Sequence, residues 1–385
     1  MKLAATIAIL WALPTLAADD VADRSRAQVQ ETLAHMTRAV LAADQAAFLA
    51  HIAPDDAFFY TEQRHWSDQL AAAKPEMFSL DIGDGPAVFA QDRAEFPLVM
   101  SWRITSGPKE SWGAGGETRT VRFPVVTFES RDGRWLYRGE KWEELKGEGF
   151  VLWHQNDDIS KKVAADVLKA FPIARDHDNE GFGVTPRPQV LKLFTSMDHL
   201  KATVYLNMPD HYLGGWSEAG ESIKFMTTYT SGVQGWTNAY AHEYGHVCTW
   251  ELGPHAAATP WWVQEGVAEL AAQEFRPGYW PKLDAQMRAL AQKGALPAFA
   301  DISDYMTTRQ SLKQLAYTQG HHMLGYISQR WGREGRNRWL RLMAADGKSL
   351  DAATQEVFQR SFADLDREWR ATLAAPPEQP VRSTP

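Results

Sequence analysis

The sequence predicts an α+β fold in which strands come first and a long run of helices follows. Segments rich in β-branched and aromatic residues occur as far as Met226, whereas helical periodicity dominates afterwards. Strands followed by helices indicate an α+β arrangement rather than alternating βαβ units. Gly147 and Gly149 interrupt the chain after the first set of strands, so we expect two domains, at residues 19–146 and 150–373.

The N-terminal domain is expected to combine a helix with an antiparallel sheet. The helix spans Val21 to His51, and strands follow it at Phe96–Thr105, Thr118–Phe128 and Trp135–Trp142. Asp132-Gly133 lies between the last two strands and is a strong signal for a tight hairpin. A helix packed on a curved antiparallel sheet resembles the cystatin-like cone, which is the architecture that we expect here.

The second domain is expected to contain a small sheet and a helical C-terminal half. Its strands are predicted at Phe150–His154, Val190–Phe194, Ala202–Leu206 and Ser222–Met226, with a helix at Ile159–Ala170. The helices of the C-terminal half are predicted at Thr237–Leu252, Pro260–Phe275, Lys282–Gln292, Leu312–Trp331, Arg336–Ala345, Leu350–Gln359 and Phe362–Leu373. The proline-rich tail, residues 376–385, is expected to be disordered.

The N-terminus has the features of an export signal. Lys2 precedes an apolar run from Leu3 to Leu13, and the small residues Thr15 and Ala17 fit a cleavage site after Ala17. The apolar run is shorter than the ~20 residues that span a bilayer. We therefore expect an exported protein, periplasmic or secreted, with no membrane anchor once residues 1–17 are removed.

Charge and cysteine content argue against two classes of function. The formal net charge is −8, without a long run of one sign, whereas a nucleic-acid partner would favour a basic face. Cys248 is the only cysteine, so no internal disulfide can form. Because Cys248 lies in a strongly apolar helix, we expect a buried small hydrophobe rather than a nucleophile.

The most informative motif is a His-Glu-x-x-His pattern formed by His242, Glu243 and His246. Residues four apart on a helix share one face, so the two imidazoles can bind one Zn²⁺ at ~2.0–2.1 Å. Glu243 lies at the flank of such a metal, where it can accept a proton from a metal-bound water without being a ligand.

Two residues are candidates for a third metal ligand. A metzincin would need glycine and histidine three and six residues after His246, but Thr249 and Leu252 occupy those positions. His255 lies in the following loop and is free to approach the metal. Glu265 lies 19 residues after His246, at the start of a second helix.

The two segments together resemble the gluzincins, and in particular the peptidase MA-like family. His242-Glu243-Tyr244-Gly245-His246 is followed by Trp262-Val263-Gln264-Glu265-Gly266-Val267-Ala268-Glu269, which is similar to that family's Trp-x-x-Glu-Gly-x-Ala segment. The resemblance covers about residues 150–373. It implies one zinc ion per chain, Glu265 as the third ligand, and Glu269 as the carboxylate that orients His242 or His246.

The resemblance also implies a hydrogen-bond donor for the developing oxyanion and an edge strand beside the metal. Tyr317 occupies the position of a tyrosine common in this family, and His321, on the same helical face, is the alternative donor. Gly214-Gly215-Trp216, followed by the segment 221–226, resembles the edge strand that can pair with an extended peptide.

These features favour a zinc-dependent hydrolase of peptide bonds, with a peptide or protein as substrate. Two other functions stay open from sequence alone. The fold could hold zinc without activity and serve in binding, although the presence of Glu243 argues against this. The N-terminal domain could instead bind a ligand, which an apolar cavity lined by Trp66, Trp102, Trp135 and Trp142 would favour.

Overall fold

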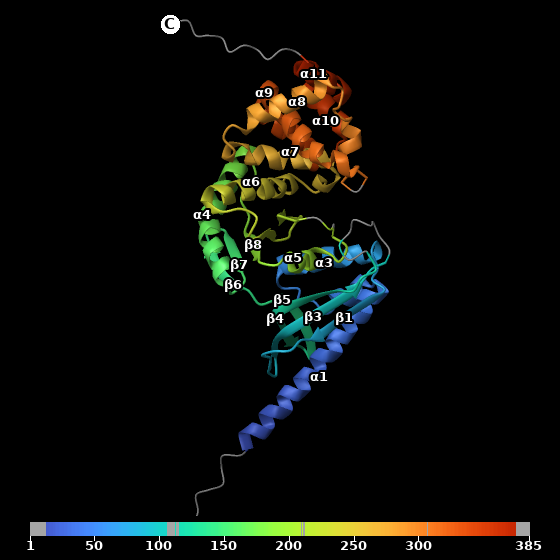
Figure 1. Cartoon of the computed structure of the whole chain (residues 1–385), viewed down its shortest axis with the longest axis vertical. Helices are drawn as coiled ribbons and strands as arrows, with labels where there is room; N and C mark the ends of the chain where they lie inside the picture. Colours follow the sequence, from blue (N-terminus) through green and yellow to red (C-terminus); the bar gives the residue numbers. More distant parts are fainter. Residues whose placement is uncertain are drawn as a thin grey trace, which may run out of the picture.

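The structure, a computed structural model, describes residues 13–105, 112, 115–208, 210, 212–305 and 307–374. Figure 1 shows an elongated molecule with three parts along its long axis. An N-terminal sheet with its long helix lies at one end, a second sheet lies in the middle, and a group of helices forms the other end. The α+β class and the order of strands before helices agree with the prediction.

The N-terminal unit consists of helices packed on a five-stranded antiparallel sheet. Its helices are α1 (Leu13–Ala42), α2 (Gln45–Leu49) and α3 (Ala57–Asp68). Its strands are β1 (Met77–Ile82), β2 (Val88–Phe89), β3 (Arg93–Arg103), β4 (Arg119–Arg131) and β5 (Arg134–Glu140). The sheet order is β1-β3-β4-β5, and β2 pairs with β3. Apolar side chains of α1 are buried against the sheet, so the helix and the sheet share one hydrophobic core.

The hairpin between β4 and β5 turns at the predicted dipeptide. Asp132 has φ of 51° and Gly133 has φ of 76°, and the flanking residues Arg131 and Arg134 are partners across the sheet. Positive φ at both central residues defines a type I′ turn, whose twist matches that of the strands. The helix-on-sheet arrangement agrees with expectation, and the resemblance to a cystatin-like cone stays a prediction.

The second sheet has mixed direction. Its strands are β6 (Glu143–Gly147), β7 (Phe150–His154), β8 (Gln189–Phe194), β9 (Gly215–Trp216) and β10 (Ile223–Met226), in the order β6-β7-β8-β10-β9. The central strands β7, β8 and β10 are parallel, whereas β6 and β9 run antiparallel at the two edges. The sheet therefore starts at Glu143, a few residues before the expected boundary, and β9 is an edge strand as expected.

Helices cover both faces of this second sheet. On one face lie α4 (Asp158–Phe182) and α6 (Gly232–Glu251), which share a core with alternate residues of β8 and β10. On the other face lies α5 (Met197–Val204), between the two sheets. The remaining helices are α7 (Trp261–Ala272), α8 (Tyr279–Gln292), α9 (Gln310–Ala344), α10 (Leu350–Phe358) and α11 (Phe362–Ala374).

Two predicted elements differ from the structure for identifiable reasons, and a predicted break between two helices is confirmed. The strand expected at Ala202–Leu206 is wrong: α5 occupies this region, because Ser196 caps the amide of His199 and starts a helix. The helix expected to end before Pro172 continues to Phe182, since its buried face packs along α6. The two helices expected on either side of Gly332 are confirmed: α9 consists of two helical segments that meet at a kink, where Gly332 has a non-helical φ of 70°.

The four tryptophans proposed to line a ligand cavity do not share one. Trp66 borders a cavity of about 60 Å³ between the N-terminal unit and α5. Trp102 and Trp135 belong to the same core without bordering that cavity, and Trp142 lies in a separate cluster between the sheets. Pockets for small-molecule ligands usually measure about 300–1,000 Å³. The tryptophans therefore serve as core side chains.

The predictions for the two ends of the chain fall largely outside the residues that the structure describes. Residues 1–12 and the tail at 376–385 lie outside the described residues, so the export signal and the disordered tail stay predictions. Within the described part of the chain, no helix is both long and apolar enough to cross a bilayer.

A buried cluster of charges joins the N-terminal unit to the second sheet. Glu62 on α3 is 5% exposed and accepts from Lys192 Nζ at 2.5 Å, and Lys224 Nζ lies 3.0 Å away. Lys224 also donates to Glu221 at 2.6 Å, and Ser222 donates to Glu62. Burial raises the pKa of Glu62, but the two ammonium groups outweigh it and hold this pKa below its usual range.

Removing the central carboxylate should therefore destabilise the protein strongly. We expect Glu62→Ala to lower the free energy of unfolding by about 3–5 kcal/mol, because Lys192 is left buried without a carboxylate and Lys224 keeps only Glu221. Urea denaturation measures this loss. The control is Glu76→Ala, which removes an exposed carboxylate 3.8 Å from Arg103 and should change stability by less than about 0.5 kcal/mol. Equal effects of the two changes would contradict the prediction.

Candidate metal centre

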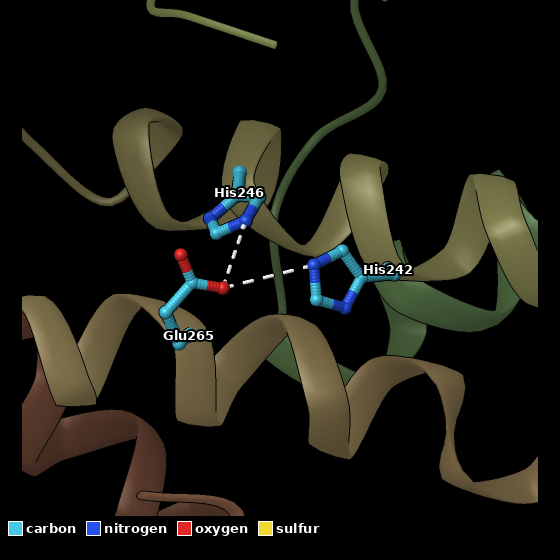
Figure 2. Close-up of side chains that lie close together, drawn as sticks. All are labelled: His242, His246 and Glu265. Atoms are coloured by element: carbon cyan, nitrogen blue, oxygen red, sulfur yellow. Dashed lines mark ion pairs between the residues drawn. The ribbon is translucent and has the colours of Figure 1, made fainter. Parts of the chain in front are cut away.

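The two histidines and Glu265 meet where helices α6 and α7 lie side by side. His242 and His246 are one turn apart on α6, and Glu265 lies near the start of α7. Glu265 Oε2 is 3.7 Å from His242 Nε2 and 3.5 Å from His246 Nε2. Figure 2 shows the three side chains pointing toward one position between the helices. The structure thus brings the three predicted ligands together.

Small residues allow the two helices to approach this closely. A Cβ placed on Gly245 would lie 2.8 Å from Ala268 Cα, a distance that real Cβ atoms do not show. On the other side of α7, a Cβ on Gly266 would lie 2.8 Å from the carbonyl group of Gly320 on α9. The glycine inside the His-Glu-x-x-His motif therefore sets the helix separation at which Glu265 reaches the histidines.

The donor set fits a zinc ion. One ligand atom from each of His242, His246 and Glu265 lies within 4.8 Å of the other two. Two ligands of one tetrahedral ion with 2.0–2.2 Å bonds are about 3.4 Å apart, close to the observed separations. Glu265 Oε2 is buried and has no hydrogen-bond partner, whereas Glu265 Oε1 accepts from Trp261 Nε1 at 2.8 Å. An orphaned buried carboxylate oxygen between two imidazoles is what a cation would satisfy.

Glu269 lies one turn after Glu265 and orients the first histidine. Its Oε1 is 3.1 Å from His242 Nδ1, and its Oε2 accepts from Arg276. Burial raises the pKa of Glu269, but His242 and Arg276 lower it to about 2. The ionised carboxylate therefore keeps a proton on His242 Nδ1 and leaves Nε2 directed toward Glu265, as metal-binding histidines require. The geometry selects His242 from the two predicted partners of Glu269.

The electrostatics of His242 follow from the same carboxylates. Burial lowers the pKa of His242, but the hydrogen bond with Glu269 and the charges of Glu269, Glu243 and Glu265 outweigh it and raise this pKa to about 9. In the metal-free protein the ring is therefore protonated at neutral pH. Metal ligands must be unprotonated, so binding of a metal at Nε2 would release this proton.

The Glu243 side chain extends from α6 to the edge strand β9. Its Oε2 accepts from Ser217 Oγ at 2.7 Å. A Cβ on Gly215 would lie 2.8 Å from Glu243 Oε1, so the carboxylate packs directly against the strand backbone and needs glycine there. Glu243 thus lies beside the ligand cluster without being one of its three members.

Tyr317 faces the site, whereas the alternatives lie elsewhere. The Tyr317 ring stacks on the His242 ring, with centroids 6.1 Å apart and an interplanar angle of 17°. His321 is fully buried, and its Nε2 lies 2.8 Å from Gln273 Oε1, on the Arg276 side of Glu269. His255 is exposed in the loop after α6, with its ring beside Gly347.

Sequence reasoning missed three residues that contact the site. Trp261 precedes Glu265 by four residues, so helical spacing could have indicated the pair. Ser217 and Arg276 reach Glu243 and Glu269 from loops outside both motif helices. Nothing in their local sequence indicates these contacts, because they depend on how distant segments pack.

A family comparison agrees with this geometry. A family model described as the peptidase MA superfamily matches residues 173–375, more than half of the chain. The chain belongs to the peptidase MA superfamily. The match supports the gluzincin-type metallopeptidase family that the motifs predicted, and peptidases of this superfamily are typically metal-dependent. The match covers the motif helices and leaves out the N-terminal unit. No curated protein sequence matches the chain.

The ligand assignment can be tested by measuring bound zinc in purified variants. We expect Glu265→Ala to lose the metal, because it removes the buried oxygen that lies between the two imidazoles. Glu269→Gln should weaken metal affinity by about 10–100-fold, the usual cost of losing the partner of a ligating histidine. His255→Ala should retain one zinc per chain. Loss of zinc in His255→Ala, with retention in Glu265→Ala, would contradict the assignment.

Proposed function

We propose that the protein is an exported zinc-dependent endopeptidase that hydrolyses peptide bonds with a metal-activated water. The observation that carries this proposal is the convergence of His242, His246 and Glu265 on one position, with the Glu243 carboxylate beside it. His242, His246 and Glu265 would hold the ion and leave a position open for water, as catalytic zinc sites do. Endopeptidase activity is proposed because the chain lacks an evident signature for binding a free amino terminus.

The zinc ion would supply Lewis-acid chemistry, by lowering the pKa of its bound water toward 7 and by polarising the substrate carbonyl. Glu243 accepts the proton of the attacking water and passes it to the leaving nitrogen. Ser217 and the backbone at Gly215 hold the carboxylate in one orientation, which keeps it within reach of that proton. Glu269 and Arg276 keep His242 in the tautomer that the ion needs.

Tyr317 is the proposed donor to the oxyanion. Its phenol is partly exposed beside His242, and burial together with Glu265 and Glu243 raises its pKa. The phenol therefore stays protonated at neutral pH and can donate a hydrogen bond to the oxygen that gains charge in the transition state. His321 is the weaker candidate, because its ring is enclosed behind Glu269.

An extended peptide is the proposed form of the substrate. Strand β9 ends the second sheet, and its outer edge pairs with no strand in the described part of the chain. Main-chain hydrogen bonds to such an edge bind a polypeptide in an extended conformation. Because Glu243 touches β9, a peptide paired there passes the candidate metal centre.

The role of Glu243 is tested by Glu243→Gln. A neutral amide cannot accept the proton, so the turnover rate of a peptide substrate should fall by about 10²–10⁴-fold. Zinc content and circular dichroism should match those of the wild type, because the carboxylate is not a ligand. Near wild-type turnover in this variant would remove Glu243 from the mechanism.

The role of Tyr317 is tested by Tyr317→Phe, with His321→Ala as the comparison. Losing one oxyanion donor commonly lowers turnover by ~10²–10³-fold, or roughly 2.7–4 kcal/mol. We expect kcat and kcat/KM to fall by similar factors in Tyr317→Phe, with zinc content unchanged. Full activity in Tyr317→Phe, combined with its loss in His321→Ala, would transfer the role to His321.

A further inference from the structure

A small pocket lies on the face of the edge strand that points away from Glu243. It measures about 150 Å³ and is formed by both units of the chain. The lining residues come from the end of α3, the end of α5 and the β9 segment: His65, Asp68, Gln69, Val204, Tyr205, Trp216, Glu218 and Glu221. Ligand pockets for whole small molecules are larger, about 300–1,000 Å³. This pocket has room for one side chain.

The alternation of side chains along β9 links the pocket to the candidate substrate edge. Gly215 and Ser217 face α6, since both lie against Glu243. Trp216 faces the other way and packs against Tyr205, with ring centroids 5.8 Å apart. Successive side chains of a strand point to opposite faces of a sheet. A peptide added to β9 would therefore direct every second side chain to the face with the pocket, and one of these side chains could enter it.

The charges in the pocket are acidic and incompletely paired. Glu221 is neutralised by Lys224 at 2.6 Å and by His65 at 2.7 Å, and Asp68 accepts from Gln45 at 2.5 Å. Within the described part of the chain, no hydrogen bond or ion pair engages the Glu218 carboxylate. Burial and the neighbouring Glu221 raise the pKa of Glu218, and they outweigh the opposing charges of His65, Lys224 and His246.

Arg64 contacts His65 in the pocket wall but is not itself a lining residue. Arg64 Nη2 is 3.1 Å from His65 Nε2, on the exposed side of that ring. The pocket interior is left with two carboxylates, Glu218 and Asp68, and the indole of Trp216. An apolar wall beside carboxylates suits a long side chain with a methylene stem and a cationic end.

We propose that this pocket is a specificity subsite for a lysine or arginine side chain of an extended peptide substrate. This inference rests on the proposed peptidase function. Glu218 pairs with the cationic end, Trp216 packs on the stem, and the N-terminal unit supplies His65, Asp68 and Gln69 as the far wall. The N-terminal unit thereby takes part in substrate selection, although it lies outside the residues that match the family.

The experiment compares cleavage of fluorogenic peptides that differ at one position. A peptide cut by the wild type is scanned with lysine, alanine and glutamate at each position around the scissile bond. We expect lysine to exceed glutamate in kcat/KM by about 10–100-fold at one position, because Glu218 attracts the ammonium group and repels a carboxylate. The two adjacent positions, whose side chains face the other way, should show a much smaller preference.

Variants of Glu218 identify the source of the preference. Glu218→Gln should reduce the lysine-to-glutamate ratio by about tenfold, and Glu218→Lys should invert it. The matched control is Glu334→Lys, which makes the same charge change at an exposed position on α9 and should keep the wild-type ratio. A wild-type ratio near one at every position, or a ratio unchanged in both Glu218 variants, would overturn the proposal.

A binding measurement separates this proposal from the proposed function. Calorimetric titration of Glu243→Gln with the same peptides needs no turnover and should give the same order of affinities. If the wild type cleaves no peptide, the peptidase function fails, and this titration still decides about the subsite. Equal binding of lysine and glutamate peptides, or no binding of either, would overturn the subsite.

Discussion

The structure depends on the close approach of α6 and α7. Gly245 lies in van der Waals contact with Ala268, and this contact places Glu265 within 3.5–3.7 Å of the two imidazoles. The approach also brings Glu269 to His242 and leaves one oxygen of Glu265 without a hydrogen bond. Burying this many ionisable groups is favourable only if they are paired or bind a cation. Helix packing and metal binding are therefore two aspects of one constraint.

A second constraint fixes the edge strand relative to the N-terminal unit. The charges of Glu62, Lys192 and Lys224 are buried together where α3 meets β8 and β10. Because β9 pairs with β10, this cluster also sets the position of the strand that contacts Glu243. Buried charges that lose their partners are costly, so the two units hold one relative arrangement. This gives the N-terminal unit a physical role at the candidate substrate edge.

A structural feature of this protein could be predicted from the sequence where it depends on a local sequence pattern. The convergence of His242, His246 and Glu265 could be predicted because helical spacing and the Trp-x-x-Glu-Gly-x-Ala segment are both short-range patterns. Helix α5 was mistaken for a strand, because a short apolar run does not distinguish the two. The partners of Glu243 and Glu269 could not be predicted, since Ser217 and Arg276 reach them only through tertiary packing.

The most direct test of the central claim is a crystal structure of the zinc-loaded protein with diffraction measured at the zinc absorption edge. We expect one anomalous peak per chain, about 2.0–2.2 Å from His242 Nε2, His246 Nε2 and Glu265 Oε2. A solvent-derived ligand should complete the coordination, within hydrogen-bond distance of Glu243. A peak held by other residues, or full zinc loading with no peak at this position, would contradict the account.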